Sequence, residues 1–172
     1  MEREDVVAAV VAAAGGELIG RVRLQKAIYL LGRLGLDSPF DFEYHHYGPY
    51  SRDLDSATVE AKAFNLVEEQ REHRKSDGAM YSVFKLVGKA NERAFGTLGR
   101  EQASNLMRLF AATNVTVLEL AATIDWLWKY EGNPDWRSEI AKRKGAKIQG
   151  GRLEKAIELL EFLGLMPPKA AS

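Results

Sequence analysis

Helical spacing dominates the chain on both sides of a single β-like interruption, and this order of segments constrains the fold more than any other feature. In the segment 21–34, apolar residues recur at intervals of three and four. The interruption covers residues 66–87, where two strand-like stretches flank the pair Asp77-Gly78, which hairpin turns favour. We therefore predict a mainly α-helical fold. It would be a winged-helix-like helical domain with a small β-hairpin wing, plus C-terminal helices packed on the same core.

Glycine and proline residues divide the predicted helices from one another. Ser51 is placed to cap a third helix, and Gly48-Pro49 predicts a turn before it. Residues 40–44 alternate aromatic and acidic side chains, as a short strand does. Further helices are predicted at 90–98, 101–112 and 116–130, at a segment beginning with Pro134, and after Gly151. We assign residues 1–98 to the winged-helix-like region and 99–172 to a C-terminal helical extension that shares its core.

Composition excludes several classes of protein. The 172 residues are 46% hydrophobic and 28% charged, which is typical of a globular domain. The 24 Lys and Arg residues balance the 24 Asp and Glu residues, so no overall field favours nucleic acid or a membrane. The absence of cysteine excludes disulfides, cysteine zinc sites and a thiol nucleophile. An acidic N-terminus is unlike a secretory signal, and we predict a cytoplasmic protein that does not contact membranes.

The sequence contains no clear pattern of a catalytic or metal-binding site. His45 and His46 would point to opposite faces of a strand, so they could not easily share a metal ion. Ser51, His46 and Asp53 could be drawn as a triad, but no nucleophile-elbow pattern accompanies them. We therefore predict no metal, no cofactor and no enzymatic activity; an enzyme centred on His45, His46 and Asp53 is a weak alternative.

Basic residues gather in the segment 21–33, at the tip of the hairpin and in the segment 137–152. Solvated helix faces, nucleic-acid phosphates and an acidic protein partner all explain such runs. The alternative function is a DNA-binding winged-helix transcriptional regulator, whose contacts would be Arg52, Arg71, Arg74, Lys75, Lys142, Arg143 and Lys144. Residues 1–100 carry slightly more acidic than basic residues, which disfavours DNA. We predict that the hairpin and the 137–152 patch lie on different faces.

Trp126, Trp128 and Trp136 lie close together in the sequence. They either pack in the core or present an aromatic anchor to a partner, since tryptophan is enriched at binding hot spots. Trp126 is the best anchor, because its neighbours Ile124 and Leu127 account for the inward face of the helix. We expect the C-terminal half, roughly 116–165, to form a homodimer contact or a docking site for another protein.

Three stretches resemble the Panacea antitoxin domain superfamily, which includes SocA-like proteins. They are Gly20–Leu31, with Arg23-Leu24-Gln25-Lys26; Tyr44–Leu54, with Tyr47-Gly48-Pro49-Tyr50-Ser51; and the hairpin after Phe64. The pattern is most similar to the uncharacterised YwgA-like branch. The resemblance covers about residues 17–87, and Thr123-Ile124 and Leu163-Gly164-Leu165 extend it more loosely.

The resemblance implies a small bacterial or phage-related regulatory protein that acts by directly binding another protein, in some members a toxin. It implies neither a cofactor nor catalysis. A cleft between the second helix and the following turn would receive the partner, through Gln25, Lys26, Tyr29, Tyr47, Gly48, Pro49 and Tyr50, with Trp126 as a separate anchor. The alternative is that the residues of the cleft only support the turn.

Overall fold

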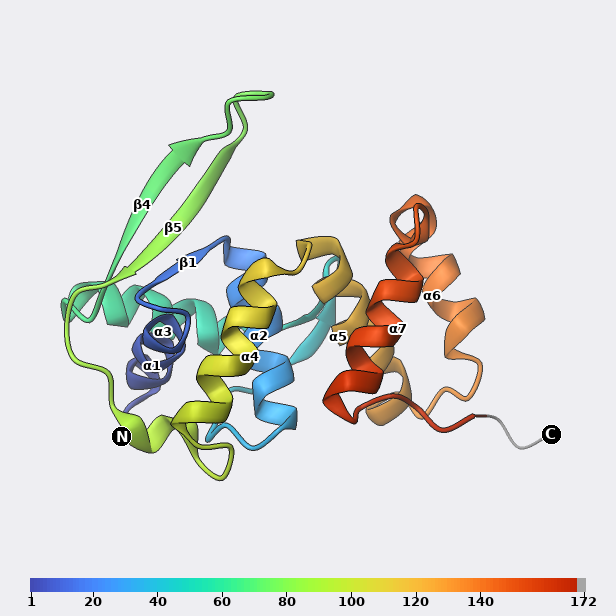
Figure 1. Ribbon diagram of the computed structural model, residues 1–172, viewed down its shortest axis with the longest axis horizontal. Helices are drawn as coiled ribbons and strands as arrows, with labels where there is room; N and C mark the ends of the chain where they lie inside the picture. The colour runs from blue at the N-terminus through green and yellow to red at the C-terminus, as the bar shows by residue number, and fades with distance from the viewer. Residues whose placement is uncertain (170–172) are drawn as a thin grey trace.

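Helices account for most of the computed structural model, which describes residues 1–169 (Figure 1). Within those residues the α-helices are α1 (Arg3–Ala13), α2 (Arg21–Arg33), α3 (Arg52–Ala63), α4 (Arg100–Ala112), α5 (Val115–Lys129), α6 (Trp136–Lys144) and α7 (Arg152–Leu163). The strands are β1 (Glu17–Ile19), β2 (Glu43–His45), β3 (Gly48–Tyr50), β4 (Val67–His73) and β5 (Met80–Leu86). Two 3₁₀ turns are η1 (Glu92–Phe95) and η2 (Gly145–Ile148). The prediction of a mainly helical protein with a small antiparallel sheet is confirmed.

Two helices form the centre of the protein. Every residue of α1 from Val6 to Val11 is fully buried, and α5 is buried from Val117 to Asp125. A helix that is apolar around its whole circumference must be enclosed by other elements. Accordingly α1 packs against α3 and α4, while α5 packs against α2, α6 and α7. One hydrophobic core runs from Val6 to Leu163 and so includes both of the regions defined from the sequence.

The larger sheet has the antiparallel order β1-β5-β4. The strand β1 was not predicted, because three residues are too few for a period-two pattern to emerge. It pairs with β5 only from Val83 to Lys85, whereas β4 pairs with β5 over its whole length. The outer part of the β4–β5 hairpin is therefore a two-stranded arm, which projects away from the helices (Figure 1).

The smaller sheet pairs β2 with β3. The strand predicted at 40–44 lies further along the chain, and Gly48-Pro49 belongs to β3 rather than to the turn, which is formed by His46 and Tyr47. A proline is accepted here because Pro49 lies in a short edge strand.

Three predicted helix boundaries are wrong. The segment 90–98 forms only η1. Helix α5 begins at Val115 rather than at residue 116, and it is capped by Asn114, whose side-chain oxygen accepts from the backbone N–H of Thr116 and Val117. Helix α6 starts at Trp136, after Pro134. No helix in the part of the chain described here is long and apolar enough to cross a membrane.

Candidate functional site

Two polar residues of α2 hold β3 and the residue that follows it from inside the protein. Lys26 Nζ donates to the carbonyl of Pro49 at 2.6 Å, and Gln25 bonds both the N–H and the C=O of Ser51. Both side chains are almost completely buried. Burial lowers the pKa of Lys26 to about 8, although the nearby carboxylate of Glu119 opposes this shift. The α2 motif thereby fixes the direction in which the chain enters α3.

Glu119 of α5 lies on the inner side of the β2–β3 turn, and two further lysines donate hydrogen bonds to its carboxylate. Lys144 Nζ is 2.8 Å from its carboxylate and also donates to the carbonyl of His46 at 3.1 Å. Lys147 Nζ reaches the same carboxylate at 3.0 Å and lies over the ring of Tyr47. This buried cluster ties α5 and the end of α6 to the β2–β3 turn.

The structure thus divides the predicted partner-binding residues into two groups. Gln25, Lys26, Gly48 and Pro49 are buried and bonded or packed within the protein, and Tyr29 donates to Asp125 at 2.6 Å. Tyr47 and Tyr50 are at least partly exposed, as is Trp126. The predicted residues therefore do not line one common cleft, and only the second group could touch a partner without rearrangement.

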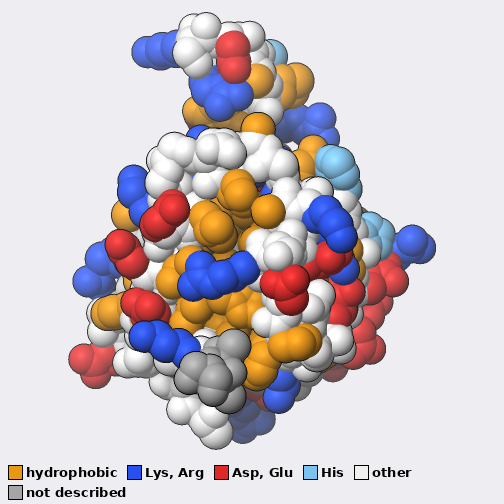
Figure 2. Space-filling model, turned by 90° about the vertical axis from the view of Figure 1, so that its right-hand side faces the viewer, with side chains coloured by type: hydrophobic (Ala, Val, Ile, Leu, Met, Phe, Trp, Pro, Cys, Tyr) orange, Lys and Arg blue, Asp and Glu red, His pale blue; other side chains and the backbone are white. Residues whose placement is uncertain are grey.

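Trp126 is neither fully in the core nor fully exposed as an anchor for a partner. It is partly buried against the core, and its ring stacks on Tyr130 at 4.6 Å between centroids. Trp128 is also partly buried, while Trp136 is buried. Figure 2 shows hydrophobic side chains gathered on the face of the molecule that carries α6 and α7, where Phe162 is 73% exposed. The prediction that the C-terminal half contacts another protein remains a prediction.

A groove of about 1220 Å³ separates the β4–β5 arm from the helical body. Its cationic lining includes Arg71, Arg74 and Lys75, which are all exposed on the arm. Its exposed apolar lining consists of Ile19, Tyr47, Met80 and Val115. Arg74 pairs with Asp77, whereas Arg71 and Lys75 have no acidic partner among residues 1–169.

The base of the arm is fixed by Glu69 of β4. Its carboxylate is only 5% exposed and contacts Arg21 of α2 at 2.7 Å and Lys62 of α3 at 2.6 Å. Ser82 of the neighbouring strand donates to it at 2.7 Å. Burial alone would raise the pKa of Glu69, but these hydrogen bonds and charges outweigh burial and lower the pKa to about 2. The groove thus has a rigidly attached wall.

The other basic segments are largely used within the protein. In α2, Arg23 donates to the carbonyls of Phe110 and Thr113, and Arg33 pairs with Asp125. In the 137–152 segment, Lys144 is buried, and Arg143 pairs with Glu131 and Glu139. Lys142 is exposed, and the exposed Arg52 pairs with Glu43. Of the predicted DNA contacts, Lys144 is therefore not available to a ligand.

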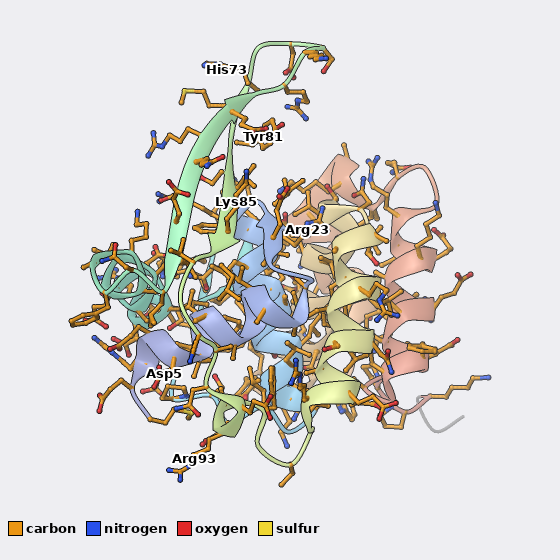
Figure 3. All side chains as sticks on the ribbon, turned by 60° about the vertical axis from the view of Figure 1, so that its left-hand side comes forward. Asp5, Arg23, His73, Tyr81, Lys85 and Arg93 are labelled. Atoms are coloured by element: carbon orange, nitrogen blue, oxygen red, sulfur yellow. The ribbon has the colours of Figure 1, made fainter. Side chains whose placement is uncertain are left out.

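The β4–β5 arm and the 137–152 segment lie in different parts of the molecule. The arm rises on the side of α1 and α3, whereas α6, which contains residues 137–144, lies with α7 on the other side (Figures 1 and 3). That the hairpin and the 137–152 patch lie on different faces stays a prediction.

The histidines are placed singly rather than as a metal site. His45 Nε2 lies 2.8 Å from Glu43, and His73 on the arm contacts the carbonyl of Gly78. Across residues 1–169, no three His, Asp or Glu side chains gather in a way that could hold a metal ion.

Sequence reasoning missed the three buried carboxylates Glu119, Asp125 and Glu69, which pair with cations of the helices. Each lies in a segment whose sequence pattern predicts a helix or a strand but does not show which cation the carboxylate will meet. The signal that could have found them is the excess of basic residues in α2, because buried cations require acidic partners.

Comparison with known proteins gives two relatives. The chain is 29% identical over 166 residues to the DNA ADP-ribosyl glycohydrolase of Thermus aquaticus, a match that covers 90% of this chain and 44% of that protein. It is 34% identical over 59 residues to the uncharacterised protein YwgA of Bacillus subtilis, covering 34% of this chain and 36% of YwgA. The chain therefore spans less than half the length of these curated relatives. No protein-family model matches it.

These relatives support one expectation and correct another. The similarity to YwgA supports the resemblance to the YwgA-like branch. The expectation of a protein without enzymatic activity is overturned by the match to a glycohydrolase along nearly the whole chain.

Proposed function

We propose that this chain is a regulatory module that binds an acidic protein partner in the groove beside the β4–β5 arm. In this proposal the arm is the wing of a winged-helix-like element of the Panacea type, and the partner is a protein that the module restrains, as an antitoxin restrains a toxin. The observation that carries the proposal is the mixed lining of the groove, which combines exposed apolar side chains with cations.

The apolar lining favours a protein over a nucleic-acid backbone. Ile19 is 48% exposed, Met80 is 55% exposed and Tyr47 is 51% exposed, and all three face one groove. Phosphates would use the cations but would leave these side chains in water, whereas an amphipathic protein segment would cover both. Exposed apolar residues clustered within a polar rim are typical of protein-binding sites.

The cationic lining indicates the charge of the partner. Arg71 and Lys75 are exposed on the arm and have no acidic partner among residues 1–169. The lining within that range also contains Arg21, Arg23 and Arg74, each of which has a partner inside the protein, and one acidic residue, Glu72. A positive groove attracts an acidic partner and speeds its association. Because Glu69 anchors the arm at its base, this wall needs little rearrangement to receive a partner.

The test compares three variants with the unmodified protein in capture experiments from a native lysate, followed by titration of the recombinant partner so identified. The double variant Arg71→Glu/Lys75→Glu reverses the charge of the arm, Met80→Ser removes an apolar contact, and Lys142→Glu is the control outside the groove. We expect the two groove variants to weaken binding by at least about tenfold and the control to leave it unchanged. Equal binding by all variants would contradict the proposal.

A second candidate function is action on ADP-ribosylated DNA, which the match to the glycohydrolase favours. The same groove cations would then contact phosphates. The test incubates the purified chain with an ADP-ribosylated DNA strand and measures release of the ADP-ribosyl group, and it measures duplex binding over a range of salt concentrations. Release in proportion to protein, or salt-sensitive binding lost in Arg74→Glu/Lys75→Glu, would favour this candidate over the first.

A further inference from the structure

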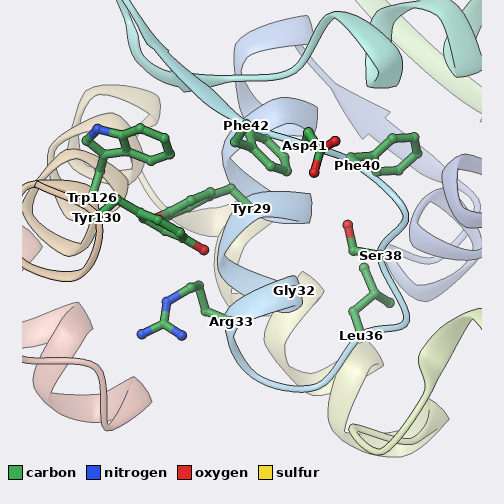
Figure 4. Close-up of a pocket in the computed structure, with 10 residues that line it drawn as sticks. All are labelled: Tyr29, Gly32, Arg33, Leu36, Ser38, Phe40, Asp41, Phe42, Trp126 and Tyr130. Atoms are coloured by element: carbon green, nitrogen blue, oxygen red, sulfur yellow. The ribbon is translucent and has the colours of Figure 1, made fainter.

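A second cavity, distinct from the groove, lies between α2, the segment 36–42 and α5 (Figure 4). It has a volume of about 290 Å³ and is lined by five aromatic side chains, namely Tyr29, Phe40, Phe42, Trp126 and Tyr130. Its polar lining comes from Arg33, Ser38 and Asp41. Small-molecule sites commonly pair aromatic side chains with a few polar groups that fix the orientation of the ligand.

Four of these five aromatic side chains are connected through ring contacts, and Phe40 lies apart from them (Figure 4). Trp126 stacks on Tyr130, and Tyr29 lies 5.2 Å from Phe42 and 6.4 Å from Trp126 between ring centroids. Tyr130 lines the cavity and is 57% exposed, so its ring is accessible to a ligand. A planar ligand could stack on this surface.

The polar groups of the cavity have unused bonding capacity. Nε and Nη2 of Arg33 donate hydrogen bonds to the carboxylate of Asp125, whereas Nη1 has no acceptor among residues 1–169. Ser38 Oγ is buried without a hydrogen-bond partner in the same described range. Asp41 is exposed and its carboxylate receives no hydrogen bond or ion pair from residues 1–169. The cavity therefore offers a cationic donor, a hydroxyl and a carboxylate acceptor.

Gly32 supplies the space for the cavity. It lies in the body of α2, where glycine destabilises a helix by about 0.5–1 kcal/mol relative to alanine. Its backbone is not in the left-handed region, so its conformation does not require glycine. A Cβ at this position would meet only Ser38, at 3.4 Å. The helix therefore carries a glycine where alanine would fit, and the effect is to leave the floor of the cavity open.

We propose that this cavity binds a nucleobase, which stacks on the aromatic surface and presents its polar edge to Asp41 and Ser38. Guanine fits best, because its ring N–H and amino group are adjacent donors for the one carboxylate, that of Asp41. The free N–H of Arg33 would contact the sugar or phosphate. The base could come from a free nucleotide or from an unpaired position in a DNA strand, and both sources present the same chemistry to the cavity.

The test is calorimetric titration of the protein with guanosine monophosphate, with a single-stranded oligonucleotide containing guanine, and with p-cresol. The first two probes distinguish the two sources, and p-cresol is an aromatic ring without a nucleobase edge. We expect at least one of the nucleobase probes to bind and p-cresol to bind far more weakly. Absence of binding by both nucleobase probes, or p-cresol binding as tightly as the better of them, would overturn the proposal.

Three variants locate the binding site. Tyr130→Ala removes the exposed stacking ring and should weaken binding about tenfold. Gly32→Leu fills the cavity from a helical position and should abolish binding, and Gly32→Ala should weaken binding while slightly raising the stability of the helix. Phe162→Ala, an exposed aromatic control on α7, should bind as the unmodified protein does. Binding that survives both Tyr130→Ala and Gly32→Leu would place the ligand elsewhere and contradict the proposal.

Discussion

Lys144 Nζ lies 2.8 Å from Glu119 Oε1 inside the protein, where the two side chains are only 1% and 5% exposed. Lys147 reaches the same carboxylate, and Lys144 also bonds the carbonyl of His46. Burial lowers the pKa of Lys144, while the carboxylate of Glu119 opposes that change. One acidic residue of α5 thus holds the C-terminal helices against the turn that the α2 motif supports.

Removing the charge of Glu119 should destabilise the fold strongly. Glu119→Gln would leave the ammonium group of Lys144 buried without a counter-charge, which costs about 3–5 kcal/mol in comparable buried pairs. We expect the free energy of unfolding, measured by urea denaturation, to fall by that amount. Glu139→Gln is the matched control, because its partner Arg143 lies near the surface and the loss should stay below about 1 kcal/mol. Equal losses in the two variants would show that Glu119 is not a structural centre.

Lys26 should make stability depend on alkaline pH. Its pKa is about 8 in the folded protein and 10.5 in an unperturbed lysine, so between these values the unfolded chain binds more protons. The free energy of unfolding therefore rises as the pH passes from 8 to 10.5, and below 8 the folded state carries the full cost of the buried charge.

The measurement compares Lys26→Met with the unmodified protein by urea denaturation at neutral and alkaline pH. The variant cannot titrate, so the unmodified protein should gain roughly 3 kcal/mol relative to it across the window. Tyrosines and lysines that do not interact with Lys26 titrate alike in both proteins and cancel in the difference. A difference that stays constant with pH would contradict the assignment.

Glu69 should make stability rise with pH in the same direction, but in the acid range. Its pKa is about 2 when folded, against 4.5 for an unperturbed glutamate, so its contribution is complete above 4.5 and is lost as the pH falls towards 2. Glu69→Gln should lower the free energy of unfolding at neutral pH by about 2 kcal/mol and reduce its acid dependence. Glu68→Gln, an exposed neighbour on β4, should behave as the unmodified protein.

Local patterns identified most of the helices, while the sites depend on long-range contacts. The spacing of Leu24 and Ile28 was sufficient to predict α2, because helical periodicity is encoded within one segment. The same segment could not reveal that Arg33 meets Asp125, since that pairing requires α5 to pack on α2. Likewise the arm was predicted from Asp77-Gly78, but its groove exists only because Glu69 fixes the hairpin to α2 and α3.

Gly48, the first residue of β3, should not tolerate a Cβ atom. Its φ of +84° is in the left-handed region, and a Cβ there would lie 2.5 Å from Thr123 Oγ1 of α5. Gly48→Ala therefore adds a collision to a backbone strain of about 1–2 kcal/mol, and we expect a loss of at least about 3 kcal/mol in urea denaturation. Gly78→Ala on the arm is the matched control: its φ is +70° but nothing lies within 4 Å of the added Cβ, so only the strain applies.

Thr123→Ala removes the colliding hydroxyl. Although this variant also loses the hydrogen bond to the carbonyl of Glu119, it should cost less stability in the Gly48→Ala background than alone. Additive losses in the double variant would mean that β3 and α5 are not in the close contact that brings the Gly48-Pro49 motif against the helix carrying Glu119.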